Sequence, residues 1–547
     1  MSVSADLILT GANVITVDDE RPRAEAVAVR GGTVLAVGPA DEVAEHRGPV
    51  TEVVDLRGRT LLPGFHDAHD HMAAYGLQLE MVELAQPARP DVPAIVSALA
   101  ERAAREAPGT WVKGAGYDNN KLPGGRHPTR GDLDRVSTDH LVFARHTSGH
   151  MCVVNSRVLE LLGIDRNTPD PAGGHIDRDA DGEATGLLQE TAFHLVTDRF
   201  YPSPVPELVA ALEAASRVYV REGITSHTEA GIGYLSPLEL LAYRSASDEG
   251  RLQVRSTLMV AATVLEDIET GADEPFFGLQ QGVRSGWGDA RVRLGPIKMF
   301  SDGSLIGRTA ALTRPYQNSS DNVGFFATPE ETLRSWILKG HASGWQIAVH
   351  AIGDRAVSFI LDCYEEAQRS HPRSDPRHRI EHCGIIDQQL LERIRRLGVI
   401  PVPQQRFIGE LGDGFRDALG PERTRWCYVQ RSFVEAGVPL PGSSDRYVVA
   451  GAPLLGIHDA VNQKTLSGRD YVPAEALTPM QAIRAFTLHS AYATFEEGWK
   501  GSITPGKVAD FAVLGEDPTA VEPAVISQIP VLGTVIGGEV VHEDGLR

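Results

Sequence analysis

The chain has 547 residues, of which 42% are hydrophobic and 23% are charged. This composition is typical of a soluble globular protein, and the length allows several domains and a large buried core. The 73 acidic and 52 basic residues give a net charge of -21, which argues against nucleic acid or an anionic membrane as a partner, because both require a basic surface.

The N-terminal sequence and the cysteines indicate a reducing compartment. The first residues carry acids rather than the basic and apolar regions of a secretory signal. No apolar run approaches the length of about 20 residues that spans a bilayer. Cys152, Cys363, Cys383 and Cys427 form no closely spaced pair of the kind seen in disulfide frameworks or cysteine zinc sites. We therefore expect a cytoplasmic protein.

Both ends of the chain are predicted to consist of short β-strands. Apolar runs lie at 5–10, 14–17, 26–30, 33–37, 510–514 and 531–541. Gly31-Gly32 and Gly537-Gly538 interrupt these runs where hairpin turns are expected. Because chain termini often lie close together, we expect residues 1–60 and 495–547 to form one small β-sandwich domain.

The middle of the chain alternates strand-like and helix-like segments. Short apolar runs lie at 399–403 and 438–442, and apolar residues recur at helical spacing in 333–342, 356–369 and 388–397. Strands that alternate with helices predict parallel βαβ units. Their number between residues 61 and 494 predicts an α/β fold, a (β/α)8 TIM barrel.

One stretch of the middle is longer than a single barrel helix requires. Residues 74–219 include a Gly/Pro-rich loop at 122–129 and a further hairpin signal at Gly173-Gly174. We expect this stretch to be an insertion that folds over the mouth of the barrel.

The first chemical motif is PGFHDAHDH at 63–71, which follows the apolar pair Leu61-Leu62. Side chains at positions i and i+2 of a strand point the same way, so His69 and His71 can share one metal ion. This pair alone is weak evidence, because a chain with 19 histidines contains such a spacing easily.

Further candidates lie at the ends of other predicted strands. His350 ends the run 346–349, His382 ends 379–381, Asp445 follows 438–444 and Lys298 lies within 292–300. The carboxyl ends of barrel strands are where catalytic residues converge in a TIM barrel. Imidazoles and carboxylates are ligands that suit zinc and similar ions. These positions together predict a metal site at the barrel mouth.

These residues lie in motifs that resemble the amidohydrolase superfamily, in particular the branch of the N-substituted formamide deformylases. The matching segments are 63–71, IKMFSDGS at 297–304, VHAIGDR at 349–355, RIEH at 379–382, SSD at 443–445, GYD at 116–118, PTRGDLD at 128–134, SGH at 148–150 and GSITPGKVAD at 501–510. The resemblance covers nearly the whole chain, and the motifs occur in a specific order.

The resemblance implies a hydrolase that cleaves a C–N bond with one or two divalent metals, usually zinc. It implies that His69, His71, Lys298, His350 and His382 hold the metal, with Lys298 carbamylated in relatives that bind two ions. A free ammonium cannot ligate a metal, so Lys298 contributes only when it is modified or deprotonated. Asp445 is expected to transfer the proton between the attacking water and the leaving amine.

The substrate contacts are expected to come from the insertion and from loops that follow the strands. We expect Tyr117, His150, His227, Asp302 and Arg308 to contribute to them. The substrate is expected to be a small molecule, and the assembly a monomer or a homodimer.

Two departures from the family pattern concern the barrel mouth. His66 stands where relatives commonly have an aliphatic residue, and we expect no metal role for it. Many relatives have a proline within two residues of the acid at 445, whereas this chain continues with Arg446-Tyr447, so the adjoining loop is expected to differ.

Three alternatives stay open. Barrel deaminases commonly have a glutamate three residues after the third metal histidine, but Gly353 stands there and Asp354 comes one position later. Ester or lactone hydrolysis uses the same attack by hydroxide on a carbonyl. A non-catalytic scaffold would have lost metal ligands, whereas this chain keeps each one expected.

Overall fold

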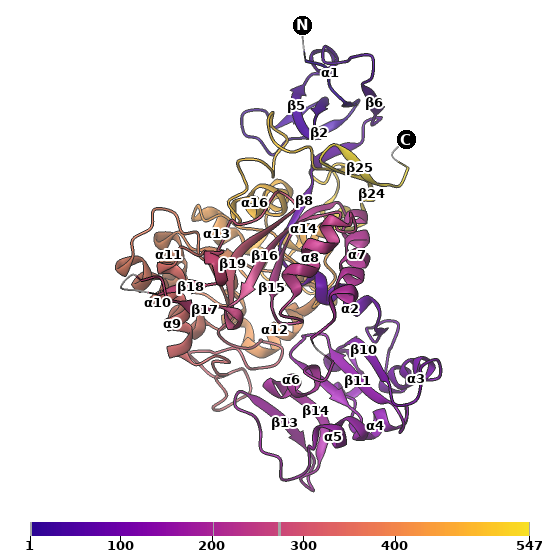
Figure 1. Ribbon diagram of the computed structural model, residues 1–547, viewed down its shortest axis with the longest axis vertical. Coiled ribbons are helices and arrows are strands. Elements are labelled where there is room, and N and C mark those ends of the chain that lie inside the picture. The colour runs from indigo at the N-terminus through magenta and orange to yellow at the C-terminus, as the bar shows by residue number, and fades with distance from the viewer. Residues whose placement is uncertain (1–2, 201, 272–274, 546–547) are drawn as a thin grey trace.

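The structure is a computed structural model that describes residues 3–200, 202–271 and 275–545. A central barrel lies between two smaller parts, which occupy its opposite ends (Figure 1). We call the part formed by both chain ends the terminal domain, and the part formed by residues 82–197 the inserted domain.

The central barrel consists of parallel strands in the order β22-β21-β20-β19-β16-β15-β8. The strands span Phe65–Asp70 (β8), Ile224–Ile232 (β15), Arg255–Ala261 (β16), Val292–Phe300 (β19), Ile347–Ala351 (β20), Arg379–His382 (β21) and Ile400–Val402 (β22). The strands are almost entirely buried, as expected for a parallel sheet covered by helices. The prediction of a mixed α/β barrel is therefore confirmed in outline.

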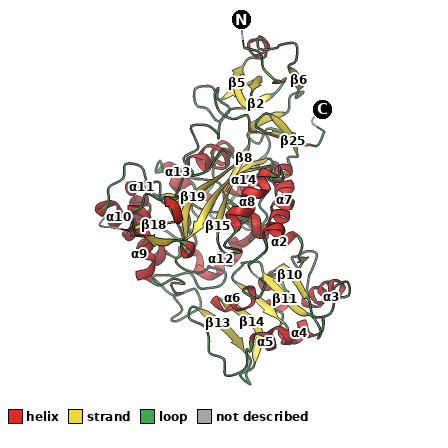
Figure 2. Ribbon diagram, in the orientation of Figure 1, coloured by secondary structure: helices red, strands yellow, loops and turns green. Residues whose placement is uncertain are grey.

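Helices surround this sheet (Figure 2). They span Met72–Leu79 (α2), Val205–Arg221 (α7), Glu239–Asp248 (α8), Glu330–Ala342 (α9), Asp354–Ser370 (α10), Gln388–Leu397 (α11), Arg406–Thr424 (α12), Arg431–Glu435 (α13), Pro453–Asn462 (α14), Pro479–Arg484 (α15) and Ser490–Tyr492 (α16). A small hairpin of Glu266–Ile268 (β17) and Phe276–Gly278 (β18) lies beside α9.

Helix α11 shows how the local sequence sets these boundaries. Asp387 caps its N-terminus by accepting a hydrogen bond from the Leu390 backbone N–H at 2.8 Å. Leu390, Leu391 and Ile394 form its buried face at helical spacing. The helix ends where Gly398 adopts a left-handed conformation with φ 62°, which glycine tolerates without a steric penalty.

The barrel has seven regular strands instead of the predicted eight, and an extended segment takes the eighth position. In this segment Gly442 O accepts from Ala68 N at 2.9 Å and Asp445 N donates to His69 O at 2.8 Å, so it follows β8. No strand ladder joins this segment to β22 among the described residues. Pro401 and Pro403 on one side, and Pro439 and Pro441 on the other, lack the N–H groups that such a ladder needs, which accounts for the irregular closure.

The terminal domain contains two sheets with the orders β5-β4-β1-β6 and β25-β24-β23-β7-β2-β3. Its elements span Leu7–Thr10 (β1), Asn13–Ile15 (β2), Arg23–Ala24 (β3), Ala26–Arg30 (β4), Thr33–Gly38 (β5), Ala40–Ala44 (α1), Glu52–Asp55 (β6), Thr60–Pro63 (β7), Phe511–Leu514 (β23), Val531–Ile536 (β24) and Glu539–Glu543 (β25). The hairpins predicted at Gly31-Gly32 and Gly537-Gly538 are confirmed. Leu9 and Val29 of the first sheet share one buried cluster with Val14 and Phe511 of the second.

The inserted domain has its own sheet, in the order β13-β14-β12-β11-β10-β9. Its elements span Val82–Glu83 (β9), Val92–Ala103 (α3), Trp111–Tyr117 (β10), Arg130–Asp134 (α4), Leu141–His146 (β11), Met151–Val154 (β12), Ser156–Leu162 (α5), Gly174–Arg178 (β13), Ala184–Glu190 (β14) and Thr191–Thr197 (α6). The chain then returns to the barrel through α7, which packs against α2.

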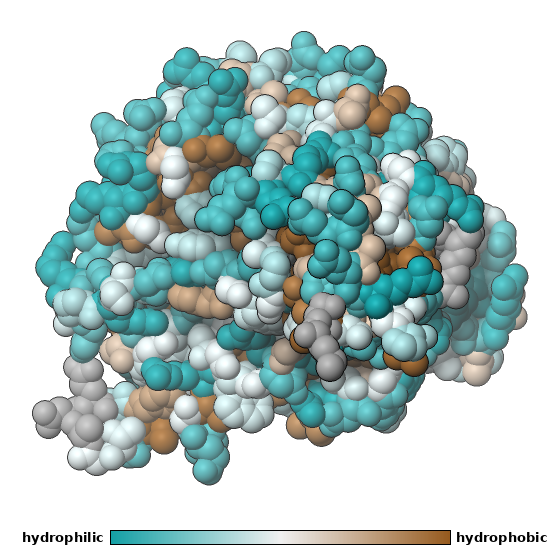
Figure 3. Space-filling view, turned by 90° about the horizontal axis from the view of Figure 1, so that it is seen from above, coloured by the Kyte–Doolittle hydropathy of each residue, from teal (hydrophilic) through white to brown (hydrophobic). Residues whose placement is uncertain are grey.

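The surface is predominantly polar. Seen from the side of the terminal domain, hydrophilic residues cover most of the molecule and hydrophobic patches are small and separate (Figure 3). Within the described residues, no helix combines the length and the apolar character that crossing a bilayer demands. Cys152, Cys363, Cys383 and Cys427 are buried free thiols.

Candidate active site

A cavity of about 530 Å³ lies between the carboxyl ends of the barrel strands and the inserted domain. This size suits a small organic molecule. The six side chains that the sequence indicated for metal binding and proton transfer all line it: His69, His71, Lys298, His350, His382 and Asp445. Residues that are far apart in the chain therefore meet in one place, as expected for the mouth of a TIM barrel.

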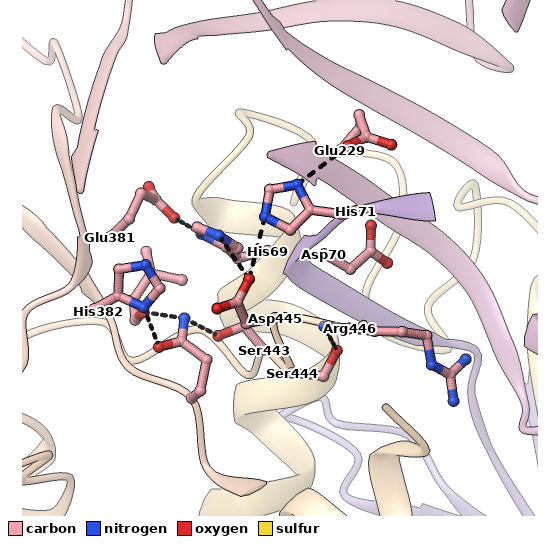
Figure 4. Close-up of polar contacts among 12 residues, drawn as sticks. His69, Asp70, His71, Glu229, Glu381, His382, Ser443, Ser444, Asp445 and Arg446 are labelled. Atoms are coloured by element: carbon pink, nitrogen blue, oxygen red, sulfur yellow. Dashed lines mark hydrogen bonds and ion pairs between the residues drawn. The ribbon is translucent and has the colours of Figure 1, made fainter. Parts of the chain in front are cut away.

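His69, His382 and Asp445 form the tightest group. Each offers one ligand atom, and these atoms all lie within 4.8 Å of one another. The backbones of His382 and Asp445 adopt the left-handed conformation, with φ of 67° and 59°. Such conformations are unfavourable for residues other than glycine and cluster at functional sites. Figure 4 shows the three side chains pointing toward one another.

Neighbouring side chains fix the orientation of two of these imidazoles. His69 Nδ1 donates to Glu381 Oε2 at 2.5 Å, and Arg379 Nε donates to Glu381 Oε1 at 2.7 Å. His382 Nδ1 donates to Gln404 Oε1 at 2.6 Å. Metal-binding histidines commonly donate their second ring N–H to such acceptors. The arrangement leaves the Nε2 atoms of His69 and His382 available for an ion.

Glu381 is charged despite complete burial. Burial opposes its ionisation, but Arg379 and His69 hold the pKa of the Glu381 carboxyl well below its ordinary value. A buried carboxylate that pairs with a buried arginine in this way orients His69 rigidly.

His71 lies between two carboxylates. His71 Nε2 is 3.2 Å from Asp445 Oδ1, and His71 Nδ1 is 3.6 Å from Glu229 Oε1. Burial opposes the charged form, but the two acids outweigh it and raise the pKa of His71 to about 10. Glu229 is held in turn by the Tyr243 hydroxyl at 2.5 Å. The imidazole therefore pairs with an acid at each of its ring nitrogens.

Asp445 is the acid that these histidines share. His69 Nε2 lies 3.5 Å from Asp445 Oδ1, on the same oxygen that His71 approaches. Burial opposes ionisation, but the hydrogen bonds from His69 and His71 hold the pKa of Asp445 well below its ordinary value. Its backbone is fixed by the hydrogen bond from Asp445 N to His69 O.

Lys298 and His350 also line the cavity. Lys298 Nζ is fully buried, has no hydrogen-bond partner among the residues that the structure describes, and lies 4.7 Å from the centre of the Phe300 ring. Burial lowers the pKa of Lys298 to about 8. His350 Nε2 donates to Gly303 O at 3.1 Å, and its ring centre is 4.5 Å from that of His382.

The side chains present fit a divalent cation. Imidazoles and a carboxylate are the donors that zinc-like ions prefer. An unpartnered buried amine is energetically costly, and a ligand that reaches Lys298 would satisfy it.

Two of the five residues expected to contact substrate line the cavity. His150 Nδ1 donates to Glu190 Oε2 at 2.9 Å. Asp302 also lines the cavity, but its carboxylate accepts three backbone hydrogen bonds, from the N–H groups of Ala311, Ile352 and Gly353. Asp302 therefore holds the surrounding loops as well as facing the cavity.

The other three lie outside the residues that line the cavity. The Tyr117 hydroxyl pairs with His127 inside the inserted domain at 3.0 Å. His227 points into the barrel interior, where its ring bonds Asp70 at 2.8 Å. Arg308 donates to Gln317 O at 3.2 Å. His66, for which no metal role was expected, bonds Thr228 at 3.1 Å and does not line the cavity.

Several residues of the site were not found from the sequence. They are Arg145, Glu190, Glu229, Glu381, Gln404 and Tyr447. Two of them carried a usable signal. Glu381 directly precedes His382 on β21, so its side chain points to the other face of the strand, toward His69. Glu229 pairs in register with Asp70, beside the His69 motif.

Comparisons with known proteins agree with this architecture. A model of the amidohydrolase family matches residues 52–542. The protein LONG AFTER FAR-RED 3 of Arabidopsis thaliana is 31% identical over 541 residues, with 98% of this chain and 91% of that protein covered. The N-substituted formamide deformylase of Arthrobacter pascens is 28% identical over 555 residues, with 99% of each covered.

Among solved structures, a metal-dependent hydrolase from Pyrococcus horikoshii superimposes with a TM-score of 0.75 at 25% identity. The superposition covers 94% of this chain and 99% of that one. The match of the family model to nearly the whole sequence, together with the barrel and its cluster of histidines, shows that this protein belongs to the amidohydrolase family.

Proposed function

We propose that this protein is a metal-dependent hydrolase that cleaves a non-peptide C–N bond of the amide or formamide type. The observation that carries the proposal is the convergence of His69, His382 and Asp445, whose ligand atoms lie within 4.8 Å of one another beside the unpartnered Lys298 amine. The N-substituted formamide deformylase, similar to this chain over its full length, supports the class of bond.

His69, His71, His350 and His382 would hold one or two divalent ions, which we propose to be zinc. A bound ion of this kind polarises a carbonyl group and makes water nucleophilic near neutral pH. Lys298 would join the ligands as a carbamate, which forms when its neutral amine adds CO2 and releases one proton. Its complete burial lowers its pKa to about 8, so the reactive neutral amine is more available near neutral pH than in an exposed lysine.

Asp445 would move the proton during hydrolysis. Its carboxylate accepts a proton from the water that attacks the carbonyl carbon, and then donates that proton to the amine nitrogen as the C–N bond breaks. The hydrogen bond from Asp445 N to His69 O keeps the carboxylate beside the ligands, at the position where both transfers take place.

The cavity wall suits an apolar substituent on the substrate. Aromatic and aliphatic side chains form part of the wall: Phe193, Leu235, Trp336, Phe407, Leu411 and Phe415. Burial of such a substituent contributes binding energy roughly in proportion to its apolar area, about 25 cal/mol per Å².

Metal analysis and a substrate screen test the proposal. Purified protein loaded with zinc, cobalt or manganese would be assayed for amine release from N-formyl and N-acetyl amines, with matched esters and lactones in parallel. We expect bound metal and amine release, and loss of turnover with retained metal in Asp445→Asn. Cleavage of esters or lactones alone would identify an ester or lactone hydrolase. Ammonia release from heterocyclic amines would indicate a deaminase, and absence of bound metal would indicate a non-catalytic scaffold.

We also propose that the enzyme acts in the cytoplasm on a small molecule, as a homodimer. The four buried free thiols support a reducing compartment. Sedimentation velocity on the metal-loaded protein tests the assembly, and a single monomeric species across micromolar concentrations would exclude the dimer.

A further inference from the structure

Arg145 is an unusual residue in the cavity wall. It lies on β11 of the inserted domain, is 5% exposed, and is the sole arginine among the described residues that line the cavity. A guanidinium keeps its charge at all physiological pH values, so a permanent positive charge is buried at this point of the wall.

The guanidinium lacks a counter-ion. Among the described residues its hydrogen-bond partner is the neutral amide of Gln78, and no carboxylate lies within 4.0 Å of it. Its Cζ atom lies 4.1 Å from the centre of the Tyr447 ring, so one face of the guanidinium is covered by an aromatic ring. A guanidinium has five N–H donors, and a single amide oxygen leaves most of them without a partner.

Four of the five acids that line the cavity are engaged elsewhere, and the fifth, Asp198, makes no ion pair with Arg145 among the described residues. Glu190 pairs with His150, Glu229 and Asp445 pair with His71, and Asp302 accepts backbone hydrogen bonds. Burying an unpaired charge is strongly unfavourable, and proteins keep such a charge where a ligand completes it. An anionic ligand bound in the cavity would supply the counter-ion that Arg145 lacks.

We propose that Arg145 binds a carboxylate on the substrate, so that the enzyme selects anionic amides. This inference rests on the proposed function for the amide, whereas the carboxylate site rests on Arg145 alone. A carboxylate matches the planar edge of a guanidinium and accepts two parallel hydrogen bonds from it. The site also overcomes the general repulsion of anions by a protein of net charge -21.

The position of Arg145 relates the carboxylate to the reacting bond. Tyr447 packs against Arg145 on one side, and its ring centre lies 5.7 Å from that of His71. One aromatic ring therefore separates the guanidinium from the candidate metal ligands. The inserted domain would select the substrate, and the barrel would cleave it.

Two pairs of probes test the site at different spacings. N-formylphenylalanine carries its carboxylate next to the scissile amide, and 4-(formamidomethyl)benzoate carries its carboxylate across a ring from the amide. Each of these two acids is compared with its own uncharged carboxamide. Within each pair only the charge changes. Dissociation constants would be measured by calorimetry on metal-loaded Asp445→Asn enzyme, so that the probes are not consumed.

The variants are Arg145→Gln, Arg145→Lys and Lys113→Gln in that background. Lys113 lies on the neighbouring strand β10 and does not line the cavity, so its substitution removes the same charge from the same sheet. We expect Arg145→Gln to weaken binding of at least one carboxylate by about 10- to 100-fold and to leave its carboxamide partner unchanged. The affinity of Arg145→Lys for the carboxylates is expected to lie between those of the parent and of Arg145→Gln, because an ammonium keeps the charge but cannot donate two parallel hydrogen bonds as a planar guanidinium does.

Several results would overturn the proposal. One is that the parent enzyme binds neither carboxylate more tightly than its carboxamide. Another is that Arg145→Gln weakens the binding of both members of a pair equally. A third is that Lys113→Gln weakens carboxylate binding as much as Arg145→Gln does. Amine release by the enzyme with an intact Asp445 is recorded separately. Absence of turnover together with carboxylate-selective binding would contradict the proposed hydrolysis and leave the carboxylate site standing.

Discussion

Glu381 accepts a hydrogen bond from His69 across the barrel, at 2.5 Å, although 312 positions separate the two residues in the chain. The bond joins β21 to β8 and directs the His69 ring toward Asp445. The same carboxylate neutralises the buried Arg379. One acid therefore serves both the orientation of a candidate metal ligand and the stability of the barrel interior.

Substitution of Glu381 by glutamine is expected to weaken metal binding. The His69 ring loses its charged acceptor, and loss of such partners typically lowers metal affinity by about 10- to 100-fold. Competition with a chromophoric chelator measures the affinity. Glu392→Gln on the exposed face of α11 is the control. Unchanged affinity in folded Glu381→Gln protein would show that this bond does not orient a metal ligand.

Lys298 is expected to react with CO2. Protein prepared with 13C-bicarbonate should show a carbamate carbon signal by NMR, and Lys298→Ala should lack it and bind fewer ions. Added short-chain carboxylates should partly restore the metal content of Lys298→Ala, because they supply the missing oxygen ligand. A wild-type spectrum without the signal, at full metal content, would contradict the carbamate.

Arg446 is expected to stabilise the loop that carries Asp445. Its guanidinium carbon lies 4.7 and 5.0 Å from the ring centres of Tyr75 and Tyr219, and the guanidinium donates twice to Glu222. Arg446→Met leaves the Glu222 carboxylate without its partner, which is expected to lower the free energy of unfolding by about 3–5 kcal/mol. Urea denaturation measures this change.

The double variant Arg446→Met with Glu222→Gln is the matched control for this prediction. It removes both charges, so it should recover a large part of the lost stability. If the double variant is as unstable as Arg446→Met alone, the loss comes from packing against the two tyrosines and not from the unpaired acid.

Glu239 is expected to make stability depend on pH. Its Oε2 atom accepts from the backbone N–H groups of Gly233 and Leu235, whereas Oε1 is buried and has no partner within the described part of the chain. Burial and the nearby Glu229 raise the pKa of Glu239 to about 8. Because the folded state then holds a proton that the unfolded state has released, the contribution of this group falls as pH rises from the ordinary glutamate pKa toward 8.

Glu239→Gln tests this dependence. The slope from one such proton is at most about 1.4 kcal/mol per pH unit, and the glutamine variant should lose it while keeping the backbone hydrogen bonds. Unfolding free energies of both proteins between pH 5 and 8 measure the difference. Parallel curves for the two proteins would exclude a protonated Glu239.

The sequence predicted elements best where local periodicity decides them. The strand expected at 292–300 and the helix expected at 388–397 have the same bounds in the structure as β19 and α11. The strand expected at 438–442 does not form a regular ladder, because Pro439 and Pro441 in this segment, and Pro401 and Pro403 in the adjacent one, lack the N–H groups that a ladder needs. Two of these prolines lie within the expected strand, and the other two lie on a segment that only the fold brings beside it.

The cavity was predicted less completely than the barrel. His227 and Tyr117 are polar residues near strand ends, but the alternation of side chains directs His227 into the barrel interior and Tyr117 into the inserted domain. Arg145 follows the apolar run 141–144 on β11, and only the docking of the inserted domain onto the barrel brings it to the cavity wall. Contacts of that kind depend on tertiary packing.

The strand that leads to His69 has its partner at the far end of the chain. β7 runs directly into β8, and β23 pairs with it residue by residue, from Phe511 opposite Pro63 to Leu514 opposite Thr60. During synthesis on the ribosome, β7 can pair with β2 at one edge early, but its other edge stays open until β23, which begins at Phe511, has been made. Premature stop codons at the start of β23 should therefore harm metal loading, although they remove no ligand.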